Sequence, residues 1–269
     1  PAFDIAGLVK GPDGGPVPGI QVQIEQNEGQ NHFVVERTRT ATDGTFRVTG
    51  VAEGTYDVTV NQGWRSGPDA PNVVPTTVKD VRAGTEGVLV QLTAGEVISG
   101  TVLSPDGEPI ARGWAAAQRV QTPDDDRALS FGDLVLDGKF TLKGLLPGDY
   151  RITFFVDGGG NRAIVLAAGS RDVTVDFSKG GIVRGRVLLA NGAAPPAGVT
   201  VSARSGSGET FDAPTAADGT YEIRGVAPGT YRVSAFVRVG TVNHSGMAEG
   251  VELVGEEVAT ADLLLVEQP

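Results

Sequence analysis

The stretch Asp218–Tyr231, DGTYEIRGVAPGTY, decides the fold because it occurs in three copies along the chain. The other two copies read DGTFRVTGVAEGTY at Asp43–Tyr56 and DGKFTLKGLLPGDY at Asp137–Tyr150. In every copy the first and third glycines are ten residues apart. Each copy is typical of a turn, a strand, a glycine-marked bend, a second turn and a strand that opens on tyrosine. The sequence therefore predicts three copies of one small module.

A second motif precedes each of these stretches. It reads IAGLVKGPDGGPVPG at Ile5–Gly19, ISGTVLSPDGEPIAR at Ile98–Arg112 and VRGRVLLANGAAPPAG at Val183–Gly198. Each version contains an Asp-Gly or Asn-Gly pair, which favours a tight turn because glycine accepts a positive φ at little steric cost. The motif therefore predicts a first strand that ends in a turn.

The strands between the turns alternate apolar and polar side chains. Residues 20–25 read IQVQIE, so every second side chain is apolar. This period of two is typical of an antiparallel sheet with one solvated face. Short strands with turns every 8–12 residues indicate a sandwich. We expect an all-β chain with no substantial helix.

The linkers between copies are very short. They are Thr93–Gly95 and Ser178–Gly180, which place the three modules at residues 1–94, 95–178 and 179–269. Short linkers leave little freedom for independent tumbling. We expect the modules to run end to end as a semi-rigid rod.

Composition excludes several classes of function. The formal net charge of −11 disfavours binding to nucleic acid and to anionic membranes. No stretch approaches the roughly 18 apolar residues that a membrane span needs. The chain has no cysteine, which excludes disulfides, thiol catalysis and thiolate metal sites. It opens on Pro1 without methionine, so we expect a processed chain or part of a longer one.

The two motifs together resemble the carboxypeptidase regulatory-like domain, a relative of transthyretin-like and Cna-B-type sandwiches within the carbohydrate-binding-like fold grouping. The resemblance covers essentially the whole chain, three times over. It implies seven-stranded Greek-key β-sandwich modules in secreted, periplasmic or surface proteins of bacteria, and it carries no shared catalytic residues. The middle copy departs most, since Arg112 stands where the first copy has Gly19.

Trp114 is the first candidate binding residue. In ungapped register it matches Gln21 on the polar face of its strand, while Ala115 and Ala117 face inward. An outward tryptophan is a candidate anchor for a sugar or a protein partner. A slip of one residue would instead place Trp114 in the core. Both interpretations stay open at this point.

Two further candidates lie in loops. Trp64 falls in the long Gly/Pro-rich segment 61–75, where it either binds a ligand or packs back onto its own sandwich. The acidic run Asp124, Asp125 and Asp126 is a conceivable calcium site, although a solvated loop is the simpler interpretation. We expect no metal centre and no cofactor.

The remaining polar residues fit structural roles. Tyr56, Tyr150 and Tyr231 recur at one position of the repeat, which indicates inward rings whose hydroxyls bond to local backbone. Asp43, Asp137 and Asp218 stand alone before glycine and are predicted to be turn residues. His32 and His244 lie in different copies without convergent partners. The sequence therefore predicts no catalytic residue and no enzyme.

Two kinds of function fit these observations. The first is a non-enzymatic structural or interaction module of a bacterial secreted or cell-envelope protein, acting as a spacer or as a protein-binding and adhesion array. Its partner would be another protein or its own parent chain, bound in part through exposed sheet edges. The alternative is a carbohydrate-binding accessory module, for which a polysaccharide is the ligand. Neither involves nucleic acid or insertion into a membrane.

Overall fold

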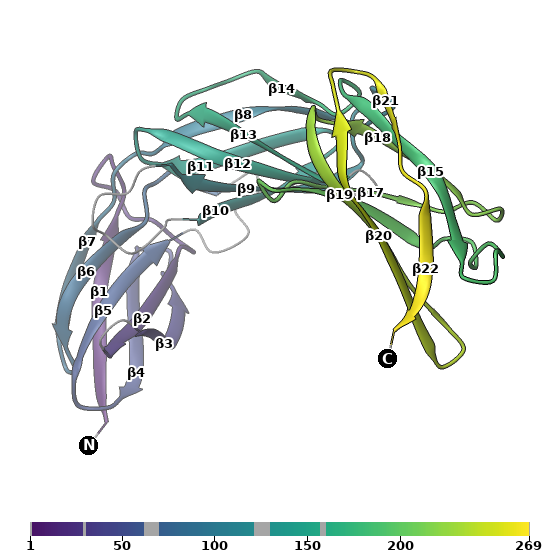
Figure 1. Cartoon of the computed structure of the whole chain (residues 1–269). Coiled ribbons are helices and arrows are strands. Elements are labelled where there is room, and N and C mark those ends of the chain that lie inside the picture. The colour runs from purple at the N-terminus through teal and green to yellow at the C-terminus, as the bar shows by residue number, and fades with distance from the viewer. Residues whose placement is uncertain (1, 29–30, 62–69, 121–129, 157–159, 269) are drawn as a thin grey trace.

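The computed structural model describes residues 2–28, 31–61, 70–120, 130–156 and 160–268. Every regular element in these ranges is a β-strand, as the alternating sequence predicts. No helix in the described ranges is long and apolar enough to cross a membrane. The strands form three successive groups along the chain, which we call the N-terminal, middle and C-terminal groups (Figure 1).

The N-terminal group consists of two sheets packed face to face. One sheet has the order β4-β1-β7 and the other has the order β3-β2-β5-β6. The first strand pairs antiparallel with β4 and parallel with β7. The strands are β1 (Phe3–Lys10), β2 (Gln21–Glu28), β3 (Asn31–Arg39), β4 (Thr45–Val51), β5 (Thr55–Asn61), β6 (Thr76–Arg82) and β7 (Glu86–Gln91).

The middle group forms one continuous, curved sheet in the order β13-β12-β9-β10-β11-β8-β14. It is continuous because β10 turns directly into β11 through Asp137 and Gly138, whose φ angles are 48° and 72°. The strands are β8 (Glu96–Leu103), β9 (Arg112–Arg119), β10 (Ser130–Leu136), β11 (Lys139–Leu145), β12 (Asp149–Val156), β13 (Gly160–Ala167) and β14 (Val173–Asp176).

The C-terminal group has the order β17-β16-β19-β20-β22-β15-β18, and β21 also pairs with β15. Its last strand is divided, since β21 and β22 pair with successive parts of β15. The strands are β15 (Gly181–Leu189), β16 (Thr200–Ser205), β17 (Thr210–Pro214), β18 (Thr220–Val226), β19 (Gly229–Val239), β20 (Val242–Leu253), β21 (Val258–Thr260) and β22 (Leu263–Gln268).

The repeated glycine of the first strand lets two strands and a ring meet closely. A Cβ on Gly100 would lie 2.0 Å from the carbonyl oxygen of Val173 and 2.9 Å from Cε1 of Phe140. Gly7 and Gly185 meet the corresponding last strand and the corresponding aromatic ring in the same way. Any side chain there would separate the first strand from its parallel partner, so the motif needs glycine for packing.

The buried apolar side chains form two cores. One belongs to the N-terminal group and includes Ile5, Val22 and Phe46. The other runs without interruption through the middle and C-terminal groups, from Ile98 to Leu265. The middle and C-terminal groups are therefore packed against each other more intimately than either is against the N-terminal group.

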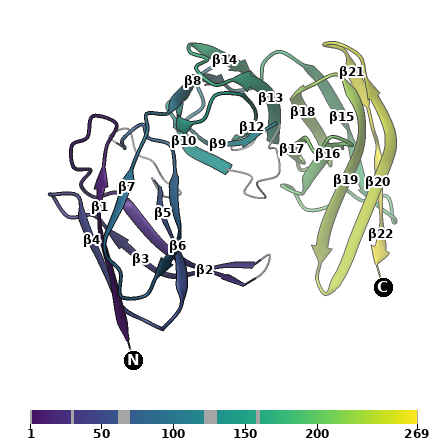
Figure 2. The ribbon, with the colours of Figure 1, turned by 90° about the vertical axis from the view of Figure 1, so that its left-hand side faces the viewer.

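The three groups follow one another end to end, but the row is bent. Figures 1 and 2 show an arch with the chain termini at its two feet. The expected rod is thus curved rather than straight. The middle-group sheet face of β9, β10 and β12 lies on the concave side in both views.

Candidate binding faces and junctions

Trp114 lies on the outer face of its strand. The side chains of Ala115 and Ala117 are buried on the other face together with Gly113, whereas Trp114 itself is half-buried. Because side chains alternate along a strand, this pattern requires the ungapped register. The alternative, in which a one-residue slip buries Trp114 in the core, is wrong.

The ring of Trp114 lies across the neighbouring strand β10. A Cβ on Gly132 would fall 2.1 Å from Cζ2 of the ring, so the ring covers this glycine. Phe155 on β12 and Leu134 on β10 stand directly opposite Trp114 in the two ladders. Phe155 is 43% exposed and Leu134 is 38% exposed. The result is an apolar row across three strands of the outer face.

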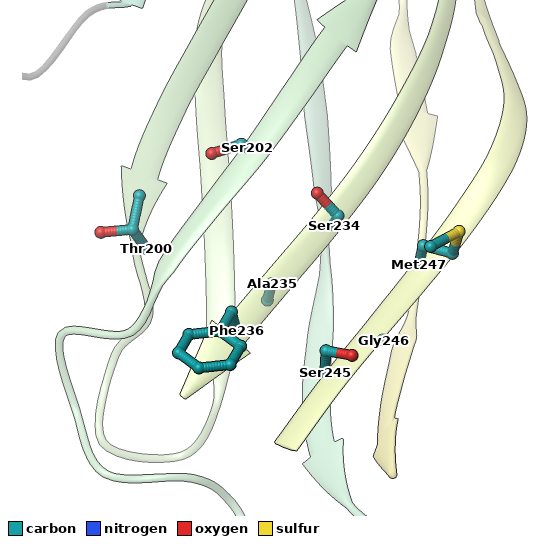
Figure 3. Close-up of a pocket in the computed structure, with 8 residues that line it drawn as sticks. All are labelled: Thr200, Ser202, Ser234, Ala235, Phe236, Ser245, Gly246 and Met247. Atoms are coloured by element: carbon teal, nitrogen blue, oxygen red, sulfur yellow. The ribbon is translucent and has the colours of Figure 1, made fainter. Parts of the chain in front are cut away.

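The C-terminal group carries a second outer face that sequence reasoning missed. Phe236 on β19 and Met247 on β20 are 59% and 63% exposed. Hydroxyl groups of serine and threonine surround them in a shallow depression, as Figure 3 shows. Its lining residues are Thr200, Ser202, Ser234, Ala235, Phe236, Ser245, Gly246 and Met247. None of them ionises, so the depression suits contact rather than chemistry.

The edge strand β3 exposes a third apolar segment. Phe33, Val34 and Val35 are consecutive, and each is more than a third exposed. β3 pairs with β2 on one side and stands at the end of its sheet. The ladder is irregular at Ile24 and Glu25, which twists the edge locally. Such an edge offers backbone donors and acceptors to an added strand.

Several predicted site residues lie outside the described residues. These are Trp64, Asp124, Asp125 and Asp126, and the side chain of His32. In the described part of the chain, no group of three or more His, Asp or Glu side chains is placed to hold a metal ion. His244 lies on β20 opposite Val237, and its Nδ1 is buried without a hydrogen-bond partner in the described ranges.

The recurring tyrosines are structural, as predicted. The hydroxyl of Tyr231 donates to the carbonyl oxygen of Ala227 at 2.7 Å, and that of Tyr56 donates to Ala52 at 3.0 Å. The hydroxyl of Tyr150 bonds to both backbone groups of Leu146. Each ring is buried, and each hydroxyl thus closes the turn four residues upstream.

The turn aspartates also have local roles. Oδ1 of Asp43 and of Asp218 accepts a hydrogen bond from the backbone N–H of the threonine two residues later, at 3.0 Å. The hydroxyl of the same threonine donates to that oxygen, and this bond lowers the pKa of both carboxyl groups. Asp137 instead occupies the tight β10–β11 turn.

Arg162 ties the middle group to the C-terminal group. Its Nη1 donates to the carbonyl oxygen of Asp176 at 2.7 Å. Its Nη2 donates to the carbonyl oxygens of Lys179 at 3.1 Å and Gly225 at 2.7 Å. The guanidinium also stacks on the ring of Phe177. One side chain thus holds the linker and the next group together.

The same junction is reinforced at the edges of two sheets. The backbone N–H of Thr210 on β17 donates to Oδ1 of Asn161 on β13 at 2.9 Å. A Cβ on Gly160 would lie 2.1 Å from the carbonyl oxygen of Thr210, so the two strands touch at backbone level. The edge strand β13 is therefore covered by the following group rather than left open.

Asn72 ties the N-terminal group to the middle group. Its Oδ1 accepts from the backbone N–H of Gly144 at 2.8 Å, and its Nδ2 donates to the carbonyl oxygen of Gly95 at 2.5 Å. Nζ of Lys143 donates to the carbonyl oxygen of Ala70 at 3.0 Å. These bonds are polar, whereas the junction around Arg162 also contains the buried ring of Phe177.

Comparison with known families gives one match, to the carboxypeptidase regulatory-like domain, over residues 4–93 and 182–265. The chain belongs to this family. The matched ranges contain the first and third copies of the repeated motifs, with Gly7, Gly185, Tyr56 and Tyr231. The middle copy, with Arg112 in place of glycine, lies outside the matched ranges. No curated protein matches the chain.

Three solved structures illustrate what this carboxypeptidase regulatory-like chain is similar to. The TIE protein of Bacillus anthracis is 12% identical over 98% of this chain and 51% of its own, with a TM-score of 0.25. BcpA, the major pilin subunit of Bacillus cereus, is 9% identical over the whole of both chains, with a TM-score of 0.25. The minor pilin GBS52 of Streptococcus agalactiae is 14% identical over 65% of this chain and 97% of its own, with a TM-score of 0.30. The chain thus spans about half the length of the TIE protein.

Proposed function

We propose that the chain is a non-enzymatic structural and interaction array of a bacterial secreted or cell-envelope protein. In this proposal three sandwich modules, at residues 1–94, 95–178 and 179–269, hold binding faces at fixed positions along an arch. The partner is another protein or the parent chain. The exposed edge β3 and the face around Phe236 and Met247 are the surfaces that we expect such a partner to meet.

The observation that carries this proposal is the way each junction is bonded. Arg162 donates to the carbonyl oxygens of Lys179 in the linker and Gly225 in the C-terminal group, and Asn72 makes two bonds across the other junction. Domains joined by a flexible linker have no need for such contacts, and their relative motion is the default expectation. Specific bonds at both junctions support a spacer that keeps its shape.

Distance measurements between spin labels test the spacer directly. Because the chain has no cysteine, two cysteines at a time can be introduced and labelled at the exposed positions Glu53, Glu108 and Glu256. We expect one narrow distance distribution for each pair of labels. Broad distributions for both pairs of neighbours, or small-angle scattering typical of a compact globule, would refute a semi-rigid spacer.

Carbohydrate binding remains the second candidate function, and one observation favours it. The Trp114 ring lies on the sheet over Gly132 of β10, and Phe155, opposite Trp114 on β12, is partly exposed. Aromatic rings held flat on a surface are suited to stack on a sugar ring. We expect native gels that contain a polysaccharide to retard the chain. Trp114→Ala should abolish this retardation.

A further inference from the structure

We propose that the outer face of the C-terminal sheet around Phe236 binds the same face of a second copy of this chain. We call this surface the Phe236 face, and it consists of Ser234, Phe236, Ser245, Met247, Leu264 and Val266. The inference rests on the proposed function and names the partner that this surface meets. The result is a symmetric dimer in which two sheets pack face to face.

The first argument is the number of exposed apolar side chains on adjacent strands. Ser245 on β20 stands opposite Phe236 on β19 and Val266 on β22, so these three side chains share one face. Met247 and Leu264 lie two residues away on β20 and β22, and therefore on the same face. The four large apolar side chains are between 46% and 63% exposed. Contiguous apolar surface of this kind marks a site where another surface docks.

The second argument is the sequence of β22. Its first four residues, Leu263–Val266, read LLLV without a polar residue. A strand with one solvated face alternates apolar and polar residues, whereas a continuous apolar run is typical of a strand that is covered on both faces. Leu263 and Leu265 are buried in the core, but Leu264 and Val266 are exposed. The sequence of β22 therefore fits a strand whose outer face is covered in an assembly.

The third argument is that the Phe236 face has no charge to bury. None of its six side chains ionises. Each copy of the chain carries a net charge of −11, so two copies can approach most readily through an uncharged surface. The centres of protein interfaces are depleted in charged residues and enriched in aromatic residues and methionine. The Phe236 face thus has the composition of an interface between copies.

The fourth argument is that the face is complementary to itself. A two-fold axis that is perpendicular to the sheet and passes through β20 at Gly246 exchanges β19 with β22 and reverses the strand direction. Phe236 then meets Leu264 of the second copy, and this contact occurs twice. Ser245 meets Met247 of the second copy in the same way. Two sheets packed face to face with nearly aligned strands are the arrangement found in β-sandwiches.

The charged residues around the face fit the same axis. Arg238 and Asp262 are both exposed, and each lies two residues outside the central contact, on β19 and just before β22. The axis therefore brings Arg238 to Asp262 of the second copy, twice, which adds two pairs of opposite charge. Arg232, which pairs with Glu249 at 3.0 Å in its own chain, comes to the uncharged Gln268. These charges favour the pairing of the face with itself.

Sedimentation equilibrium of the intact chain over a range of concentrations tests the proposal. We expect the average mass to rise from that of one chain toward that of two, with a dissociation constant of roughly 1–100 μM. Phe236→Ser and Leu264→Ser should each weaken the dimer by about tenfold or more, because each removes an apolar contact that occurs twice. Since the two side chains meet each other, the double variant should dimerise little less than the weaker of the single variants.

Phe155→Ser is the matched control. Phe155 and Phe236 each stand five residues after a recurring tyrosine, Tyr150 and Tyr231, and both are exposed. Phe155→Ser should leave the dissociation constant of the dimer unchanged. Circular dichroism of each variant reports whether the sheets are intact.

An exchange of charges tests the symmetry of the dimer. Arg238→Glu and Asp262→Arg should each weaken it by about tenfold, because like charges then meet twice. An equimolar mixture of these two variants should form mixed dimers about as tight as those of wild type, because opposite charges then meet at both contacts. The double variant Arg238→Glu, Asp262→Arg should recover the dimer in a single protein for the same reason.

The proposal fails if the intact chain stays monomeric up to roughly 1 mM. It also fails if Phe236→Ser and Leu264→Ser leave the dimer unchanged, or if mixing the two charge variants restores nothing. A monomeric chain whose retardation in polysaccharide gels is lost in Phe236→Ser would show that this face binds a sugar instead. The spin-label distances are measured within one chain, so they test the spacer whether or not a dimer forms.

Discussion

The guanidinium carbon of Arg162 lies 4.8 Å from the centroid of the Phe177 ring. Phe177 is fully buried and directly follows the last strand of the middle group, so the stacked pair marks the point where one group gives way to the next. The planar guanidinium packs on the ring and still directs its N–H groups at three carbonyl oxygens. This pair is the centre of the second junction.

Replacing Arg162 by alanine should loosen that junction. The variant leaves the carbonyl oxygen of Gly225 without its donor and uncovers Phe177, so we expect a loss of about 2–3 kcal/mol in the free energy of unfolding. The distance distribution between labels at positions 108 and 256 should broaden, while that between 53 and 108 stays narrow. Arg162→Lys keeps the charge but not the planar fork. Its distance distribution between positions 108 and 256 should therefore be broader than that of wild type and narrower than that of Arg162→Ala. Equal widths in all three proteins would contradict this role.

Replacing Gly100 by alanine tests why the first-strand motif needs glycine. The new Cβ would collide with the carbonyl oxygen of Val173, so β8 and β14 must separate, at a cost of about 3 kcal/mol or more. Gly107→Ala is the matched control, because Gly107 has a φ of 82° and its Cβ would meet nothing closer than 4.0 Å. We expect the control to cost about 1–2 kcal/mol from backbone strain. Urea denaturation measures both, and a larger loss in the control would refute the packing explanation.

Much of the fold follows from the repeated motifs, and some of the candidate site does too. The glycines and tyrosines recur because each is required by a contact that every copy makes, which is what a repeat preserves. The sequence left Trp114 open between the outer face and the core, and the structure places it on the outer face because Gly113, Ala115 and Ala117 face inward. The alternation in residues 233–239, VSAFVRV, also predicts that Phe236 faces away from the buried side of its strand.

Other features could not be read from the sequence for physical reasons. Asp-Gly in the three copies gives two different turns, and the choice depends on whether the flanking strands pair directly, as β10 and β11 do. The bonding partners of Arg162 are backbone carbonyls from three separate positions, which leave no trace in side-chain identity. A short linker predicts little freedom between neighbouring groups, but it does not predict the angle at which they meet.

Removing the side chain of Asn72 should free the first junction. In Asn72→Ala the backbone N–H of Gly144 loses its acceptor, which we expect to cost about 1–2 kcal/mol. The label distance between positions 53 and 108 should broaden, while that between 108 and 256 stays unchanged. Asn72→Asp keeps the acceptor for Gly144 but loses the donor to Gly95. Its free energy of unfolding should therefore lie between those of wild type and Asn72→Ala. A change at the second junction instead would show that Asn72 does not act locally.

The buried hydroxyl of Tyr231 should make the fold sensitive to alkali. Burial, with a smaller contribution from Glu209, raises the pKa of Tyr231 to about 12, against about 10 for an unfolded tyrosine. The folded state therefore favours the neutral hydroxyl, and its contribution is complete below pH 10 and lost as the pH rises toward 12. Two pH units correspond to roughly 2–3 kcal/mol of stability.

Tyr231→Phe isolates this contribution. The variant loses the bond to Ala227, so at pH 8 it should be less stable than wild type by about 1 kcal/mol. It has no hydroxyl to ionise, so its stability should fall less steeply between pH 10 and pH 12, and the two curves should cross. Tyr150 and Tyr221 also have raised pKa values and remain in both proteins, so they set a common background. Urea denaturation measures the free energy of unfolding of both proteins between pH 10 and pH 12. If the two free energies fall in parallel, Tyr231 ionises as readily in the folded as in the unfolded state.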